Sequence, residues 1–175
     1  MELKTILDHR RSTRKFLPRR VEHDKLQRIV GMALQAPSSR NSRSTRLLVV
    51  EQPELLEKIA SMRDYGSAFI SGAAAAILVM GDRRATDLWI DNCAITATVM
   101  QLAAVDEGLA SCWVHVNGRP RLVKEPDGEQ AGDFLRTFLP IPEHYGILCA
   151  IALGYSDFTP APLPPYEGEE RVKWL

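Results

Sequence analysis

The sequence lacks the short motifs that mark several large enzyme classes. It contains neither the G-x-G-x-x-G fingerprint nor the G-x-x-x-x-G-K-[ST] loop, so it supports neither a Rossmann-type pyridine-nucleotide site nor a P-loop. It also lacks the G-x-S-x-G turn that presents the nucleophile of α/β-hydrolases. A catalytic site in this chain therefore has to be sought outside these arrangements.

Cysteine is scarce, and its spacing excludes the common cysteine sites. Cys93, Cys112 and Cys149 lie far apart and form no C-x-x-C pair, so a zinc site is not indicated. Each of the three lies in an apolar stretch, which is typical of buried free thiols in a reducing compartment.

Long apolar runs and an excess of one charge are missing as well. Lys+Arg and Asp+Glu both number 22, so the whole chain has no electrostatic preference for nucleic acid and any anion site must be local. The weakly polar run near residues 68–80 is too short to cross a bilayer, and MELKTILDHRR at the start has no apolar signal-peptide core. We therefore expect a cytoplasmic protein with no membrane or nucleic-acid partner.

The chain length of 175 residues suits one domain, and apolar periodicity divides it into helices and strands. We expect an α/β or α+β domain with a covered sheet. A long helix over 87–108 is apolar nearly all round, which predicts a central, buried position. The helices are expected near residues 3–7, 24–34, 53–62, 87–108 and 131–139, and the strands at 46–51, 73–82, 110–116 and 146–155.

A basic stretch, HRRSTRKF, occupies residues 9–16 without any acid. Arginine offers planar, bidentate donors that match phosphate oxygens, and the Ser and Thr between the bases add neutral donors. The same composition is typical of a solvated basic face or a nuclear-type signal. Leu7 and Phe16 flank the stretch, however, and a free tail would not need such apolar anchors.

Two further stretches carry polar groups next to predicted strands. In APSSRNSRST, residues 36–45, Ser38, Ser39 and Asn41 could hydrogen-bond a polar ligand, although an ordinary helix-to-strand loop has the same composition. In GLASCWVHV, residues 108–116, the pattern suggests a core position for Trp113. His115 could be a general base or a histidine satisfied within the fold, and no acid is placed to pair with it.

Taken together, these stretches resemble the nitroreductase family of flavin enzymes. RRSTRKF is similar to the family's R-R-S-x-R-x-F motif, and APSSRNSRSTRLLVV to its A-P-S-x-x-N-x-Q-P-W-x-F-x-V-V motif. DNCAITATVMQLAAVDEGLASCWV resembles the family's long helix ending in G-L-G-x-C-W-I, and ALGY with a Pro-rich tail resembles its C-terminal strand and extension. The matches occur in the family's order over nearly the whole chain.

The resemblance implies an α+β, three-layer fold with a central, mostly antiparallel sheet and a long helix at a homodimer interface. It implies one nitroreductase-like domain over 1–175, whose extension, 154–175, packs on the partner subunit. It also implies FMN at that interface and NAD(P)H as the electron donor. Hydride would pass through flavin N5 to a nitroaromatic, quinone or flavin acceptor in ping-pong order, without a catalytic side chain or a metal.

The family's binding residues can be carried over position by position. Arg10 and Ser12 would hold the phosphate, Arg11 the phosphate and ribityl, and Arg14 the N1/O2 side of the ring. The partner subunit would supply the loop, and a backbone N–H near His115 would approach N5. The implied cofactor-binding set is Arg10, Arg11, Ser12, Arg14, Pro37, Ser38, Ser39, Asn41, Arg43, Trp113, Val114 and His115.

The sequence departs from the family pattern in three places. Arg43-Ser44-Thr45 stands where Gln-Pro-Trp is usual, PLPPYEGEERVKW lacks the expected basic pair at matching positions, and GDRRATDLW leaves no room for inserted pocket helices. Three alternatives therefore stay open: a flavin-binding or storage protein without turnover, a flavin-fragmenting or dehalogenating relative, and a nucleic-acid binder that uses the basic stretch.

Overall fold

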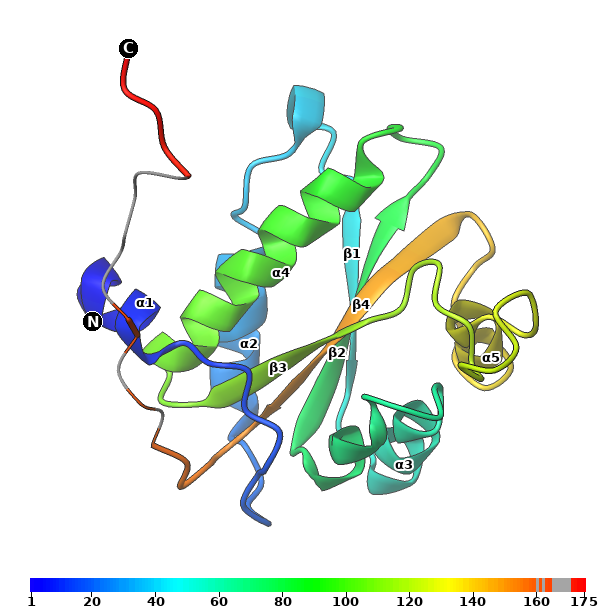
Figure 1. The fold of residues 1–175 in the computed structure, drawn as a ribbon, viewed down its shortest axis with the longest axis horizontal. Helices are drawn as coiled ribbons and strands as arrows, with labels where there is room; N and C mark the ends of the chain where they lie inside the picture. The colour runs from blue at the N-terminus through cyan, green and yellow to red at the C-terminus, as the bar shows by residue number, and fades with distance from the viewer. Residues whose placement is uncertain (160, 162, 165–170) are drawn as a thin grey trace.

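The computed structural model describes residues 1–159, 161, 163–164 and 171–175 (Figure 1). The helices are α1 (Leu3–His9), α2 (His23–Ala33), α3 (Pro53–Ala60), α4 (Trp89–Asp106) and α5 (Ala131–Arg136), with short 3-10 turns η1 (Ser39–Asn41) and η2 (Ala68–Gly72). The strands are β1 (Thr45–Val50), β2 (Ala75–Asp82), β3 (Ala110–His115) and β4 (Tyr145–Gly154).

The strands form one sheet in the order β1-β2-β4-β3, and every pair is antiparallel. The two central strands, β2 and β4, are almost entirely buried along their length. Their sequences are continuous apolar runs, as expected for strands covered on both faces. β1 and β3 form the edges, and β3 lies beside the segment that carries the basic stretch.

Helices cover both faces of the sheet and give three layers, as Figure 1 shows. One apolar core joins the sheet to α2 and α4 through residues such as Ile29 and Met100. The other joins it to α3, η2 and α5 through residues such as Ile59 and Leu135. The predicted α+β fold, with helices on either side of an antiparallel sheet, is confirmed.

The first turn of α4 lies very close to the sheet because two strand residues are glycines. Trp89 packs its ring over Gly81 of β2 and Gly146 of β4. A Cβ atom added at Gly146 would lie 2.4 Å from the Trp89 ring, which no side-chain adjustment of a buried indole relieves easily. These glycines therefore fix the distance of α4 from the sheet.

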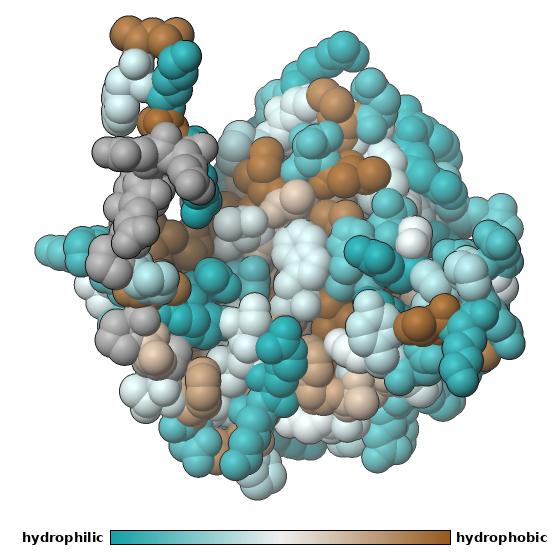
Figure 2. All heavy atoms as spheres, viewed as in Figure 1, coloured by the Kyte–Doolittle hydropathy of each residue, from teal (hydrophilic) through white to brown (hydrophobic). Residues whose placement is uncertain are grey.

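The expected central, buried position of α4 holds for the side that faces the sheet, whereas its outward side is exposed in this chain. Ile90 and Ile95 are each 40% exposed, and Leu88 just before the helix is 43% exposed. A helix that lies flat on a sheet buries only the part of its circumference that faces the sheet. Figure 2 shows several apolar side chains exposed over α4 on the side turned to the viewer. This outward apolar stripe is suited to covering by another surface.

The start of the C-terminal extension lies against its own chain. Tyr155 accepts a backbone hydrogen bond from Leu17 at 2.8 Å, and the Ser156 hydroxyl donates to the Lys15 carbonyl at 2.8 Å. Residues 160, 162 and 165–170 of the extension are outside the described part, so packing of 154–175 on a partner subunit stays a prediction. No helix within the described ranges is both long and apolar enough to span a bilayer.

Candidate functional site

The open edge of β3 is the natural place for a ligand to meet the backbone. Just after β3 ends, the Val116 N–H donates to the Leu148 carbonyl of β4 at 2.9 Å. Successive residues of a strand direct their N–H and C=O groups to opposite edges. The N–H and C=O groups of Trp113 and His115 therefore point away from β4, toward the open edge of the sheet. Their N–H groups have no partner among the residues that the structure describes.

The basic stretch runs alongside the first part of this edge. Thr13 donates its N–H to the Ser111 carbonyl at 3.0 Å, and Ser12 forms an isolated parallel bridge with Ser111. In an extended segment, alternate side chains project to the same side. Arg10, Ser12 and Arg14 therefore share one side, opposite to the buried Thr13.

Arg11 is turned away from its neighbours. Its guanidinium donates to the carbonyls of Asp8 at 2.7 Å and Arg10 at 2.9 Å, and to that of Ala161 at 3.1 Å. It thus satisfies carbonyl groups at the end of α1 and connects this end to the C-terminal extension. In this single chain Arg11 stands apart from the group formed by Arg10, Ser12 and Arg14.

The side shared by Arg10 and Arg14 carries positive charge without a counterion. Within the described ranges, neither arginine forms an ion pair with a carboxylate. The Arg14 guanidinium lies 5.9 Å from the centre of the Phe69 ring, so an aromatic surface adjoins this charge. Burial raises the pKa of the nearby Cys112 thiol, which makes this cysteine a poor nucleophile. The geometry favours an anionic, partly aromatic ligand rather than covalent chemistry.

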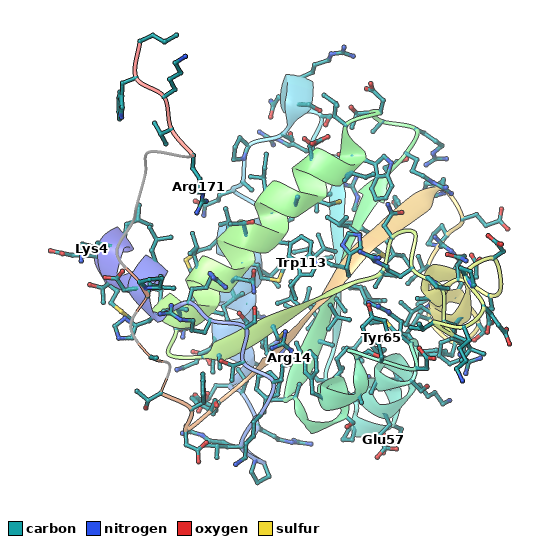
Figure 3. The ribbon with its side chains drawn as sticks, viewed as in Figure 1. Lys4, Arg14, Glu57, Tyr65, Trp113 and Arg171 are labelled. Atoms are coloured by element: carbon teal, nitrogen blue, oxygen red, sulfur yellow. The ribbon has the colours of Figure 1, made fainter. Side chains whose placement is uncertain are left out.

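Side chains from the end of β3 complete this half of the site. Trp113 and His115 project to the same face, with ring centroids 6.3 Å apart and planes within 8° of parallel, whereas Val114 is buried in the opposite core. Burial, and then the charges of Arg119 and Arg63, lower the pKa of the His115 imidazole. The ring is therefore neutral near pH 7. Figure 3 places Arg14, Trp113 and Tyr65 around β3 on the side turned to the viewer.

The second predicted half, Pro37–Arg43, is a conformationally strained loop. Arg40, Asn41 and Arg43 have φ angles of 50°, 51° and 45°, in the left-handed region that favours glycine. Non-glycine residues adopt this region only when the surrounding structure dictates it, and such strain clusters at functional sites. The Ser38 hydroxyl accepts the Arg43 N–H at 2.9 Å, which closes the loop on itself.

Asn92, in the first turn of α4, holds this loop and is almost completely buried, at 1% exposure. Its Oδ1 accepts the Ser39 N–H at 2.8 Å. Its Nδ2 lies 3.2 Å from the hydroxyls of Ser39 and Ser42 and 3.0 Å from that of Ser44. One amide side chain therefore connects the loop to the helix at several points.

The two predicted halves do not meet within one chain. The loop is attached to α4 at Asn92, whereas the basic stretch lies beside β3, which begins just after α4 ends at Asp106. At 1.5 Å per residue, these two points of α4 are about 21 Å apart. Figure 1 shows the loop that holds η1 and the segment after α1 at opposite ends of the helix. The structure therefore brings Arg10, Ser12 and Arg14 to the open edge of β3, beside Ser111, but holds the Pro37–Arg43 loop at Asn92, near the other end of α4.

Two residues of this region, Asn92 and Arg63, were missed by sequence reasoning. Asn92 is one of two amides, with Gln101, in a largely apolar helical pattern, and a buried polar residue in such a pattern signals a specific hydrogen-bond partner. Arg63 lies in the polar turn after α3, where an arginine carries no periodic signal, and it donates to the His115 carbonyl at 3.2 Å.

Comparisons with known proteins identify the family and the fold of this chain. The sequence model of the nitroreductase family matches residues 7–63 and 58–155, which together span most of the chain. The chain belongs to the nitroreductase family. The family that the sequence motifs resemble is thus confirmed. A Methanothermobacter thermautotrophicus protein, provisionally named an NADH dehydrogenase/NAD(P)H nitroreductase, is 30% identical over 163 residues, covering 91% of this chain and 80% of its own.

Solved structures extend the likeness to three dimensions. An FMN-dependent nitroreductase from Clostridium difficile R20291 superposes with a TM-score of 0.90 at 32% identity, covering 97% of this chain and 96% of that one. A nitroreductase with bound FMN from Desulfitobacterium hafniense DCB-2 shares the fold, with a TM-score of 0.76 at 24% identity, covering 100% of this chain and 99% of that one.

Proposed function

We propose that this chain is an FMN-dependent oxidoreductase that transfers electrons from NAD(P)H to a small acceptor such as a nitroaromatic, a quinone or a free flavin. The observation that carries this proposal is the open edge of β3, where the Trp113 and His115 N–H groups and the guanidinium groups of Arg10 and Arg14 have no hydrogen-bonded strand or carboxylate partner among the described residues. The C. difficile relative named FMN-dependent and the NAD(P)H named for the archaeal relative support the cofactor and the donor.

The residues of this half-site fit FMN in chemical terms. Arg10 and Ser12 would bind the phosphate, since a guanidinium and a hydroxyl both donate to phosphate oxygens. Arg14 would lie near the N1/O2 side of the ring and stabilise negative charge there. The His115 N–H would donate to N5. When bound, FMN would supply the hydride and electron chemistry, and the chain would supply position and charge.

The second half of the site would come from a partner subunit. Pro37–Arg43 is attached near the start of α4, whereas the basic stretch adjoins β3 beyond the other end of this helix, and the outward side of α4 carries exposed apolar residues that include Ile90 and Ile95. Packing two copies through α4 would cover this stripe. The loop of one subunit would then approach the β3 edge of the other, and each homodimer would hold two FMN sites.

Purified protein tests this function directly. We expect it to bind FMN, to oxidise NADH or NADPH anaerobically when a nitroaromatic or quinone is present, and to be a dimer in light scattering. Protein that FMN cannot reconstitute would contradict the proposal. Protein that binds FMN but is reduced by neither donor would instead be a flavin-binding or storage protein.

Substitutions in the basic stretch should separate its roles. Arg10→Ala is expected to weaken FMN binding by about 1.5–3 kcal/mol, the scale of a charge-assisted hydrogen bond, with little change in the flavin spectrum. Arg14→Ala is expected to lower the reduction potential of bound FMN, because the charge gained on reduction loses its partner. Titration calorimetry and potentiometry measure the two effects, and the exposed Arg20→Ala serves as control. Equal potentials in the Arg10 and Arg14 variants would refute this division.

A further inference from the structure

Arg63 is the one charged side chain that is buried among the described residues, with 9% of its surface exposed. It lies in the turn between α3 and η2, and none of the described carboxylates is within ion-pair distance of it. Removing a charge from water costs several kcal/mol unless a counter-charge or several hydrogen bonds compensate. The contacts of the Arg63 guanidinium therefore show how far the cost of burying its charge is compensated.

Those neighbours compensate the charge only in part. One guanidinium nitrogen donates to the His115 carbonyl at 3.2 Å, and the guanidinium carbon lies 4.4 Å from the centre of the Tyr65 ring. The buried Nε atom has no hydrogen-bond partner among the described residues. A carbonyl and an aromatic face attract a cation but do not cancel its charge, so a net positive charge remains beside the open edge at the end of β3.

The contact with His115 falls on a peptide group that is held from both sides. The carbonyl of the peptide joining His115 to Val116 accepts from Arg63, and its N–H donates to Leu148 at 2.9 Å. Such a peptide group cannot rotate without breaking one of these bonds. The preceding N–H, that of His115, is thereby fixed in its direction toward the open edge. This is the donor assigned to flavin N5 in the proposed function.

The charge of Arg63 also acts on the groups at this edge. Burial first, and then the charges of Arg119 and Arg63, lower the pKa of the His115 imidazole. Arg119 is exposed, and solvent ions screen its charge, whereas a buried charge is screened much less. An anion at the edge of β3 would therefore be attracted by both arginines, and the attraction of the buried Arg63 would persist at an ionic strength that screens Arg119.

We propose that Arg63 is a positioning residue that fixes the His115 N–H and supplies a second fixed positive charge favouring the reduced state of FMN. This inference rests on the proposed function, because it takes FMN as the ligand of the β3 edge. It assigns Arg14 and Arg63 complementary tasks. Arg14 would reach the ring from the exposed side, whereas Arg63 would act from the protein interior, through the backbone and through its charge.

Three variants test the inference. Arg63→Met removes the charge and the donors at similar length, Arg63→Lys keeps the charge, and Arg119→Met removes the exposed charge as a matched control. We expect Arg63→Met to weaken binding of reduced FMN about tenfold more than that of oxidised FMN, which lowers the two-electron potential by about 30 mV. Arg63→Lys should largely restore the potential, and at physiological ionic strength, where salt screens the exposed Arg119, Arg119→Met should lower it much less than Arg63→Met does.

A second readout needs no flavin. In FMN-free protein, hydrogen exchange of the Val116 amide should become about tenfold faster in both Arg63 variants, because the peptide group loses its restraint. Should Arg63→Met fail to fold, the exchange measured in Arg63→Lys decides the question. The inference would be overturned if the Val116 amide of the Arg63 variants exchanged as slowly as in the wild type, or if Arg63→Met kept the wild-type two-electron potential of FMN. Failure of the wild-type protein to bind FMN would contradict the proposed function instead, and the exchange measurement would still test the restraint.

Discussion

Replacement of Asn92 by leucine is expected to lower the free energy of unfolding by about 2–4 kcal/mol. Leucine has the same branching at Cγ as asparagine but has no polar atoms. The Ser39 N–H and the hydroxyls of Ser42 and Ser44 would lose their partner, and each buried polar group left unsatisfied costs about 1–3 kcal/mol. Part of this cost is relieved when the loop moves into water.

Urea denaturation followed by circular dichroism measures the effect. Thr98→Val on the same helix is a matched control, because the exposed Thr98 hydroxyl bonds only the Ala94 carbonyl, at 2.9 Å. The control should change the unfolding free energy by less than about 0.5 kcal/mol. If Asn92→Leu were as mild as the control, Asn92 would not be the residue that holds the loop.

Asn92 also explains how the strained loop persists. Each left-handed non-glycine residue costs about 1–3 kcal/mol, and Arg40, Asn41 and Arg43 adopt this conformation close together. The hydrogen bonds from Asn92 to Ser39 offset part of this cost. Once they are lost, the loop can relax, and its polar groups no longer keep one arrangement. Asn92→Leu should therefore weaken FMN binding as well as lower stability.

Apolar patterning predicted the elements of the fold because burial of a face imposes its period on the sequence. The run over 73–82 became β2, and the expected helix over 87–108 became α4 at Trp89–Asp106. The strand order β1-β2-β4-β3 has no such local signal, because it depends on which strands pair across long separations in the sequence. Only the family resemblance made an antiparallel sheet predictable.

The candidate site was predictable to a different degree in its two halves. An extended segment next to an edge strand turns Arg10 and Arg14 to one side, but the sequence does not say that residues 10–14 are extended. The opposite direction of Arg11 could therefore not be foreseen. The left-handed residues of the loop were equally hidden, because non-glycine side chains in that region are held by tertiary contacts, here those of Asn92.

The division of the site between subunits predicts that two defective chains can restore one another. A chain with Arg10→Ala and Arg14→Ala would lack the phosphate and ring contacts, whereas a chain with Asn92→Leu would lack an ordered loop. Each homodimer should bind FMN weakly at both sites. In a heterodimer, one site combines both defects, and the other combines the unaltered halves of the two chains.

Co-expression with two different affinity tags isolates that heterodimer. We expect it to bind FMN with near wild-type affinity at about half of its sites, as measured by titration of flavin absorbance. A heterodimer of one Arg10→Ala chain and one Arg14→Ala chain is the control, because each of its sites keeps one defect. Recovery in the first heterodimer but not in the second requires that the β3 edge and the Pro37–Arg43 loop come from different subunits. Absence of recovery would mean that both halves serve FMN from the same chain, which the separation along α4 argues against.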